Sequence, residues 1–186
     1  MTTDEILFDA EERMEKALTK FKDDLRGLRT GRATPALLDS LRVEYYGSPT
    51  PIKQLAQVST PDPQQLVIRP FDAGALKEIE KAIRSSNLGM APNNDGKIIR
   101  LQVPAMSGEQ RTKMVALIKK TAEETKVSCR NVRRDANKGL ETAEKNGEIT
   151  EDDLTKFKDQ VQNLLKSFED KIQEAADKKG KEVMEQ

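Results

Sequence analysis

Residues 107–147 read SGEQRTKMVALIKKTAEETKVSCRNVRRDANKGLETAEKNG. Apolar and small side chains recur in this stretch every three or four residues, namely Met114, Ile118, Ala122, Thr125, Cys129, Val132, Ala136, Leu140 and Ala143. That period predicts one long helix with a single buried stripe. Ser107 and Gln110 have capping-box spacing at its start, and Asn146-Gly147 indicates its end. About 38 residues at ~1.5 Å each make a helix of roughly 57 Å, which must pack against other helices to bury its stripe.

Two other segments have stripes of the same kind. The first runs from about Thr3 to Arg29, and its apolar residues form a heptad with two interleaved leucines: Leu7, Met14, Phe21 and Leu28, with Leu18 and Leu25. The second begins after Thr150, with Asp153 in capping-box position, and its stripe is Leu154, Phe157, Val161, Leu164, Leu165, Phe168, Ile172, Ala175 and Val183. A turn over residues 145–148 makes this helix antiparallel to the 107–147 helix. We therefore expect an elongated antiparallel three-helix bundle formed by residues 1–30 and 106–186.

Residues 31–105 have a different composition, because six of the eight prolines lie between Pro35 and Pro70. Residues 41–46, 66–68 and 98–103 are typical of strands, Gly47-Ser48-Pro49 of a turn, and residues 75–86 of a helix. The fold class is therefore α+β, with a small α+β domain inserted between the first two bundle helices. The chain crosses between the domains twice, and we expect a hinge made of Thr30, Gly31, Arg32, Ala33, Pro104, Ala105 and Met106. The alternative is two tight loops beside a fixed interface.

The composition argues against catalysis. The chain has no histidine, and its one cysteine, Cys129, lies on the apolar stripe, where a packing role is expected. Glu151-Asp152-Asp153 belongs to a first helical turn, where carboxylates complement the helix dipole. We expect no catalytic residue, no metal site, no cofactor and no small-molecule substrate. The acidic N-terminus lacks a signal-peptide pattern and no apolar run approaches a membrane span, so we expect a cytoplasmic protein without membrane contact.

Charge is segregated although 32 basic and 32 acidic residues give a net charge of +0. Residues 109–147 hold ten basic and six acidic residues, whereas residues 148–186 hold seven and eleven. A projection at ~100° per residue, with Val132 facing the core, puts one set on a single flank: Lys119, Lys126, Arg130, Arg133 and Asn137. Arg134 lies just beyond this flank.

The use of arginine predicts an anion-binding surface, because the guanidinium fork matches phosphate. Salt bridges within the bundle are the alternative. Arg29 and Arg32 flank the first crossing and would extend the surface; ordinary cation placement at a helix C-terminus is the alternative for Arg29.

The sequence strongly resembles the bacterial ribosome recycling factors over essentially its whole length. Four stretches carry the resemblance: residues 29–35 (RTGRATP), 43–47 (VEYYG), 127–137 (VSCRNVRRDAN) and 149–153 (ITEDD). The resemblance implies an L-shaped monomer that binds the large ribosomal subunit after termination. With elongation factor G and GTP, such a factor splits the ribosome, and it hydrolyses nothing itself.

The resemblance also implies roles for individual residues. Arg133 would be the leading contact with ribosomal RNA, with Arg130, Arg134, Arg29 and Arg32 beside it. Gly31 and residues 104–106 would be hinges, and the smaller domain would face elongation factor G. The residues alone leave two other interpretations open: a helical cochaperone or coiled-coil adaptor that binds proteins, and a hydrolase that uses Asp152 and Asp153.

Overall fold

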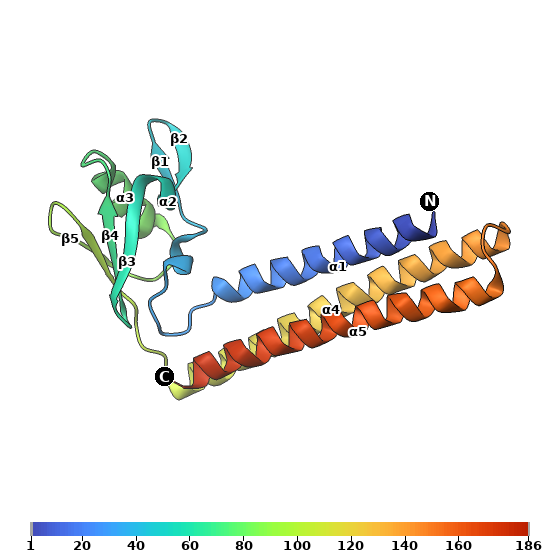
Figure 1. Cartoon of the computed structure of the whole chain (residues 1–186). Coiled ribbons are helices and arrows are strands. Elements are labelled where there is room, and N and C mark those ends of the chain that lie inside the picture. The colour runs from blue at the N-terminus through green and yellow to red at the C-terminus, as the bar shows by residue number, and fades with distance from the viewer. Residues whose placement is uncertain (1, 186) are drawn as a thin grey trace. The chain divides into compact units, whose positions relative to one another are not determined.

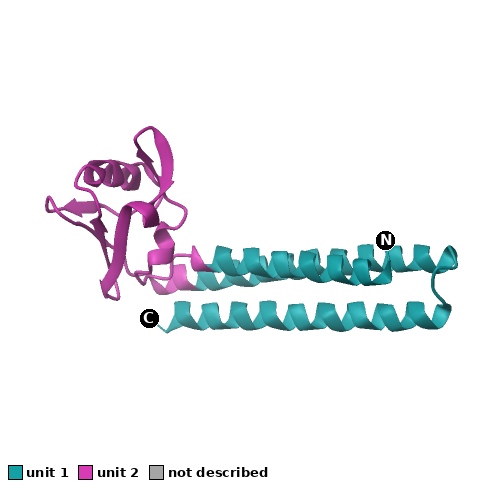
Figure 2. Ribbon diagram, turned by 45° about the horizontal axis from the view of Figure 1, so that its top comes forward, with its two compact units in different colours: residues 1–25, 112–185 teal, residues 26–111, 186 magenta. Residues whose placement is uncertain are grey.

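The computed structural model of the chain describes residues 2–185, which form two compact units (Figure 2). The helical unit comprises residues 2–25 and 112–185, and the α+β unit comprises residues 26–111. The division therefore falls a few residues from the expected boundaries at 30 and 106. The first helix ends at Arg26, so the segment after it is grouped with the α+β unit.

The helical unit consists of α1 (Thr3–Arg26), α4 (Gly108–Lys145) and α5 (Glu151–Met184), with α4 antiparallel to both of the others (Figure 1). Both predicted capping boxes are present. At the start of α4, the amide of Gln110 donates to Ser107 Oγ at 3.2 Å, and the amide of Ser107 donates to Gln110 Oε1 at 2.9 Å. At the start of α5, the amide of Asp153 donates to Thr150 Oγ1 at 3.2 Å. Gly147, with φ +74°, makes the turn between α4 and α5.

The buried face of α1 differs from the predicted heptad. Its fully buried residues are Ile6, Ala10, Met14, Leu18, Phe21 and Leu25. Leu7 is only half-buried, and Leu28 lies beyond the end of the helix. The prediction was wrong at these two positions because a nearly straight helix repeats every 3.6 residues, which favours spacings of four over a strict heptad. Gly31 has the expected positive φ, 79°, but it lies in the connecting segment and does not end the helix.

Small residues on α4 allow the helices to pack closely. Cys129 has no exposed surface, and burial raises the pKa of its thiol, as expected of a packing residue. Gly139 is a further close contact, because a Cβ placed there would lie 3.2 Å from Cδ1 of Ile6 on α1. On α5 the buried alanine is Ala176, one residue after the predicted Ala175.

The α+β unit contains two antiparallel sheets and three short helices. In chain order the elements are η1 (Pro35–Leu38), β1 (Arg42–Tyr45), β2 (Ser48–Pro51), α2 (Ile52–Leu55), β3 (Ala56–Asp62), β4 (Gln65–Pro70), α3 (Ala75–Ser85), β5 (Pro92–Asn94) and β6 (Ile99–Gln102) (Figure 1). Strands β1 and β2 form a hairpin, and the other sheet has the order β3-β4-β6-β5. The core includes Leu66, Ile68, Ile79, Ile99 and Leu101, all with no exposed surface.

Three strands, β2, β3 and β5, were not predicted, because proline suppresses the strand pattern. Ser48-Pro49, predicted as part of a turn, belongs to β2, and the turn is Tyr46-Gly47. Strand β3 contains Pro61 beside an irregularity in its pairing with β4. All three are edge strands, where a residue without an N–H is tolerated.

Both connecting segments are attached to the same turn of the α+β unit. The amide of Ala33 donates to the carbonyl of Pro63 at 2.7 Å, and the amide of Val103 donates to the carbonyl of Gln64 at 2.8 Å. Ala33, a predicted hinge residue, belongs to the core of this unit.

A tyrosine connects the β1–β2 hairpin to the start of α3. The hydroxyl of Tyr45 donates to Asp72 Oδ2 at 2.8 Å, and Asp72 Oδ1 accepts the amide of Gly74 at 3.0 Å. The hydrogen bond to this carboxylate raises the pKa of Tyr45 to about 12. The amide of Gly74 is the main cause of a lowered pKa for Asp72.

Replacement of Phe21 by alanine tests the seam of the helical unit. Phe21 is 1% exposed, so Phe21→Ala should lower the free energy of unfolding by about 3–5 kcal/mol. The matched control on the same helix is Phe8, which is 69% exposed. Phe8→Ala should change the free energy of unfolding by less than about 0.5 kcal/mol. Urea unfolding followed by circular dichroism measures both, and similar losses would contradict the assignment of the buried face.

The pKa of Tyr45 predicts an alkaline stability change. Because the folded pKa is raised, the contribution of the hydrogen bond is complete below about pH 10 and is lost as the pH rises toward about 12. Asp72→Asn should return the pKa of Tyr45 toward its ordinary value. NMR of ring-labelled tyrosine near pH 11 should find Tyr45 mostly protonated in the parent and mostly ionised in the variant; equal ionised fractions would refute the explanation.

Candidate nucleic-acid interface on the basic helix

Three cations of α4 lie on one flank that faces α5; the helical projection predicted the shared flank but not its contacts with α5. Each contacts a polar side chain of α5: Lys126 Nζ donates to Gln173 Oε1 at 2.6 Å, Arg130 Nε to Glu169 Oε1 at 2.8 Å, and Arg133 Nη1 to Gln162 Oε1 at 2.8 Å. The three side chains are half-buried. We call Lys126, Arg130, Arg133 and Asn137 the basic flank.

Arg130 is neutralised within the helical unit. Besides Glu169, its Nη1 donates to Glu123 Oε1 at 2.9 Å. The hydrogen bond with Glu123, followed by that with Glu169, raises the pKa of Arg130 above its ordinary value. The alternative interpretation, a salt bridge within the bundle, therefore holds for Arg130, which orients the flank more than it supplies free charge.

Lys126 and Arg133 keep their charge because their partners are neutral amides. A glutamine oxygen accepts a hydrogen bond without cancelling the cation, so both remain attractive to an anion. Arg133 Nε and Asn137 Oδ1 are buried and have no hydrogen-bond partner among residues 2–185. Arg133 is half-buried, since its guanidinium lies against α5.

Arg134 and Lys138 extend the positive surface toward solvent. Both are exposed, and within the described residues neither side chain has a hydrogen bond or ion pair. Lys138 was not singled out from the sequence, although its position four residues after Arg134 puts it on the same face. Gln162 and Gln173 were also not identified from the sequence as partners of the cations of the basic flank. The pattern that could have indicated them is the presence of uncharged glutamines on a helix rich in acidic residues.

Arg29 and Arg32 belong to the α+β unit and not to the basic flank. The guanidinium of Arg29 donates to the backbone carbonyl of Asn87. The helix C-terminal role considered for Arg29 is wrong, because α1 ends at Arg26. Arg32 is exposed and makes no hydrogen bond or ion pair within residues 2–185.

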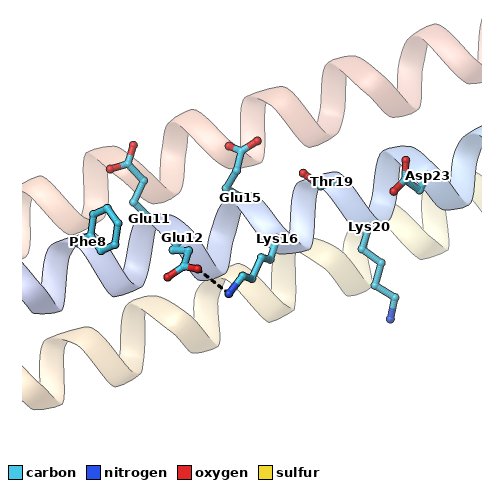
Figure 3. Close-up of a pocket in the computed structure, with 8 residues that line it drawn as sticks. All are labelled: Phe8, Glu11, Glu12, Glu15, Lys16, Thr19, Lys20 and Asp23. Atoms are coloured by element: carbon cyan, nitrogen blue, oxygen red, sulfur yellow. Dashed lines mark ion pairs between the residues drawn. The ribbon is translucent and has the colours of Figure 1, made fainter.

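The outward face of α1 has the opposite character. Figure 3 shows eight side chains of this face, which include Glu11, Glu12, Glu15 and Asp23 and no arginine. Lys16 is paired with Glu12 at 2.7 Å. This face would repel a polyanion, so within the helical unit α4 is the helix suited to one.

Two carboxylates outside the flank have lowered pKa values that local contacts explain. Lys158 lowers the pKa of Glu141, and the hydroxyl of Thr150 lowers that of Asp153 in the capping box. Among residues 2–185 the histidine, cysteine, aspartate and glutamate side chains form no group that could hold a metal ion. None of the helices in that range is sufficiently long and apolar to span a bilayer.

The fold and the flank define a class of protein: a three-helix bundle that has a basic flank on one helix and carries a separate α+β unit. The family model for ribosome recycling factor matches residues 21–184. The chain belongs to the ribosome recycling factor family.

Individual relatives agree over nearly full length. The chain is 49% identical to the ribosome-recycling factor of Nitratidesulfovibrio vulgaris over 185 residues, which is 100% of both chains. It is 48% identical to that of Halalkalibacterium halodurans, covering 97% of this chain and 98% of the relative. The ribosome-recycling factor of Rhodopirellula baltica is 62% identical over 138 residues, 74% of each.

Two solved structures have the same fold. A solution structure of the ribosome recycling factor superimposes with a TM-score of 0.83 at 39% identity, covering 100% of this chain and 99% of that one. The second belongs to models of the T. thermophilus ribosome recycling factor and E. coli elongation factor G bound to the E. coli post-termination complex. It has a TM-score of 0.70 at 40% identity and covers 98% and 99% of the two chains. These matches favour the ribosomal interpretation over a cochaperone, an adaptor or a hydrolase.

Truncation of single arginines should separate the paired from the free side chains. Arg130→Ala should lower the melting temperature more than Arg134→Ala, because only Arg130 joins two carboxylates. The difference should shrink in high salt, which screens exposed ion pairs. Thermal unfolding at low and high salt measures both, and an equal or larger effect of Arg134→Ala would show that the pairing is not structural.

Proposed function

We propose that this chain binds the post-termination ribosome and, with elongation factor G and GTP, splits it into subunits. Membership of the family and the likeness to a factor placed with elongation factor G on a post-termination complex support this proposal. GTP hydrolysis then belongs to the elongation factor, and this chain acts by binding, as a cytoplasmic monomer.

We propose that α4 contacts RNA of the large subunit. The observation that carries this step is the pairing of Lys126 and Arg133 with glutamine oxygens, which leaves their charge uncompensated. Arg133 is the leading contact, since its remaining N–H donors match phosphate oxygens. Arg134 and Lys138 add charge from the exposed face, while Asn137 adds a hydrogen-bonding group.

We assign supporting roles in RNA binding to three further arginines: Arg130, Arg29 and Arg32. Arg130 holds the flank in position through its two carboxylate partners. Arg32 is exposed and unpaired within the described residues, so it can meet RNA from the α+β unit. Arg29 joins it only after releasing the carbonyl of Asn87.

Work on the ribosome would require stiff and movable parts. The seam of three long helices supplies stiffness, because bending α4 would separate side chains packed along its length. Residues 30–32 and 104–106 are proposed as hinges; they are irregular, and the chain on the α+β side is held by Ala33 and Val103. The partner then moves the α+β unit while α4 holds RNA.

Co-sedimentation with ribosomes tests the RNA contact. Binding of the parent should weaken by roughly 0.7–0.9 log units per tenfold salt for each phosphate neutralised. The double variant Arg133→Ala, Arg134→Ala should bind more weakly, with a shallower salt dependence, and should split ribosomes poorly.

The control is Lys166→Ala, which removes an exposed charge from α5. It should behave as the parent. Binding that does not respond to salt, or an equal loss for the control, would refute the assignment to α4 and favour a protein-binding adaptor.

A further inference from the structure

The tip of the β1–β2 hairpin forms a pocket that the proposed RNA contact does not use. It has a volume of about 380 Å³ and is lined by Glu44, Tyr45, Tyr46, Gly47, Gly74 and Glu78. The two tyrosine rings meet edge to face, with centroids 4.5 Å apart. Strand β1, the hairpin turn and the start of α3 therefore place aromatic rings and carboxylates around one opening.

Tyr46 occupies its position at a conformational cost. Its φ is +50°, which L-residues other than asparagine and aspartate rarely adopt. It forms a two-residue turn with Gly47, φ +75°, for which Asn-Gly is the favoured sequence. Tyr46 is 89% exposed, so burial of its side chain within the described residues does not offset this strain. A large ring at the tip is thus explained by something outside the chain that covers it.

The carboxylates in the pocket lack partners. Within residues 2–185, neither Glu44 nor Glu78 makes a hydrogen bond or ion pair. The neighbouring Asp72 is instead used internally, because it accepts the hydroxyl of Tyr45 and the amide of Gly74. The ring of Tyr45 is thus held by its hydrogen bond to Asp72, whereas the ring of Tyr46 is exposed and the carboxylates of Glu44 and Glu78 are unpaired.

We propose that this pocket accepts an arginine or lysine side chain of a protein partner. A cation placed over the face of Tyr46 gains a cation–π contact, and Glu44 and Glu78 supply the opposite charge. Arginine fits better than lysine, because its planar guanidinium can stack on a ring while donating to a carboxylate. Two uncompensated carboxylates disfavour RNA, whose phosphates they would repel.

The partner's identity rests on the proposed function. If the chain acts with elongation factor G, the elongation factor is the protein that supplies the basic side chain. The pocket would then couple the α+β unit to the elongation factor while α4 holds RNA.

The first test examines the chemistry of the pocket alone. The chain has two tyrosines and no tryptophan, and both tyrosines lie here, so ring-labelled tyrosine reports on this pocket. Titration of the full chain with N-acetyl-arginine amide should shift both ring signals, whereas N-acetyl-citrulline amide, of similar shape and uncharged, should shift them far less. The double variant Glu44→Gln, Glu78→Gln should lose the difference. Equal responses to the two probes would overturn the proposal.

The second test examines the partner. Subunit splitting is measured at increasing concentrations of elongation factor G with GTP. Tyr46→Asn and the double glutamine variant should each raise the half-maximal concentration about two- to fivefold, as loss of an exposed cation–π contact or of two exposed charge contacts implies. Tyr46→Asn should keep or raise the melting temperature, because asparagine suits the turn. Asp62→Asn, an exposed charge outside the pocket, is the matched control and should behave as the parent.

The outcomes are separable. An unchanged half-maximal concentration in both pocket variants would overturn the assignment to the elongation factor. Weaker co-sedimentation of these variants with ribosomes alone would show that the hairpin contacts the ribosome, and would also overturn it. Failure of the parent to split ribosomes at any concentration would refute the proposed function, while the comparison of arginine with citrulline would still decide the chemistry of the pocket.

Discussion

The apolar seam shared by α1, α4 and α5 is the constraint from which the rest of the helical unit follows. None of the three helices can bury its stripe alone, and most of the stability of such helices comes from packing. Cys129, with no exposed surface, and Gly139, in contact with Ile6, are small enough for close approach. Once Val132 faces this seam, the residues about 100–160° around the helix must lie along the junction with α5. Burial of the apolar stripe, rather than charge, therefore determines which way the basic flank of α4 faces.

The charge available on that flank depends on what α5 places opposite it. Glu169 neutralises Arg130, whereas Gln162 and Gln173 hold Arg133 and Lys126 through neutral oxygens. An ion pair and an amide hydrogen bond both position a cation, but only the neutral amide leaves the positive charge uncompensated. Selective pairing thus lets one helix contribute both to the bundle and to a surface of uncompensated positive charge in a chain of zero net charge.

The α+β unit separates structural from available groups in a similar way. The carboxylate of Asp72 accepts hydrogen bonds from the hydroxyl of Tyr45 and from the amide of Gly74, whereas Glu44 and Glu78 are unpaired beside Tyr46 within the described residues. The unit is also tied to both connecting segments through Pro63 and Gln64. Its edge strands contain prolines, which are tolerated at a sheet edge because an N–H is not required there, but which hide the strand pattern in the sequence.

The sequence by itself determined the three long helices, their caps at Ser107 and Thr150, the buried Cys129 and the side of α4 on which the cations lie. Those features are local or periodic, so residue spacing suffices to find them. Only the tertiary structure decided which cations are free. Whether Arg130 meets Glu169 or Arg133 meets Gln162 depends on the register of α4 against α5, which no local pattern encodes. The pairing of β4 with β6, and the position of Tyr46 beside Glu78, likewise join residues distant in sequence through long-range packing.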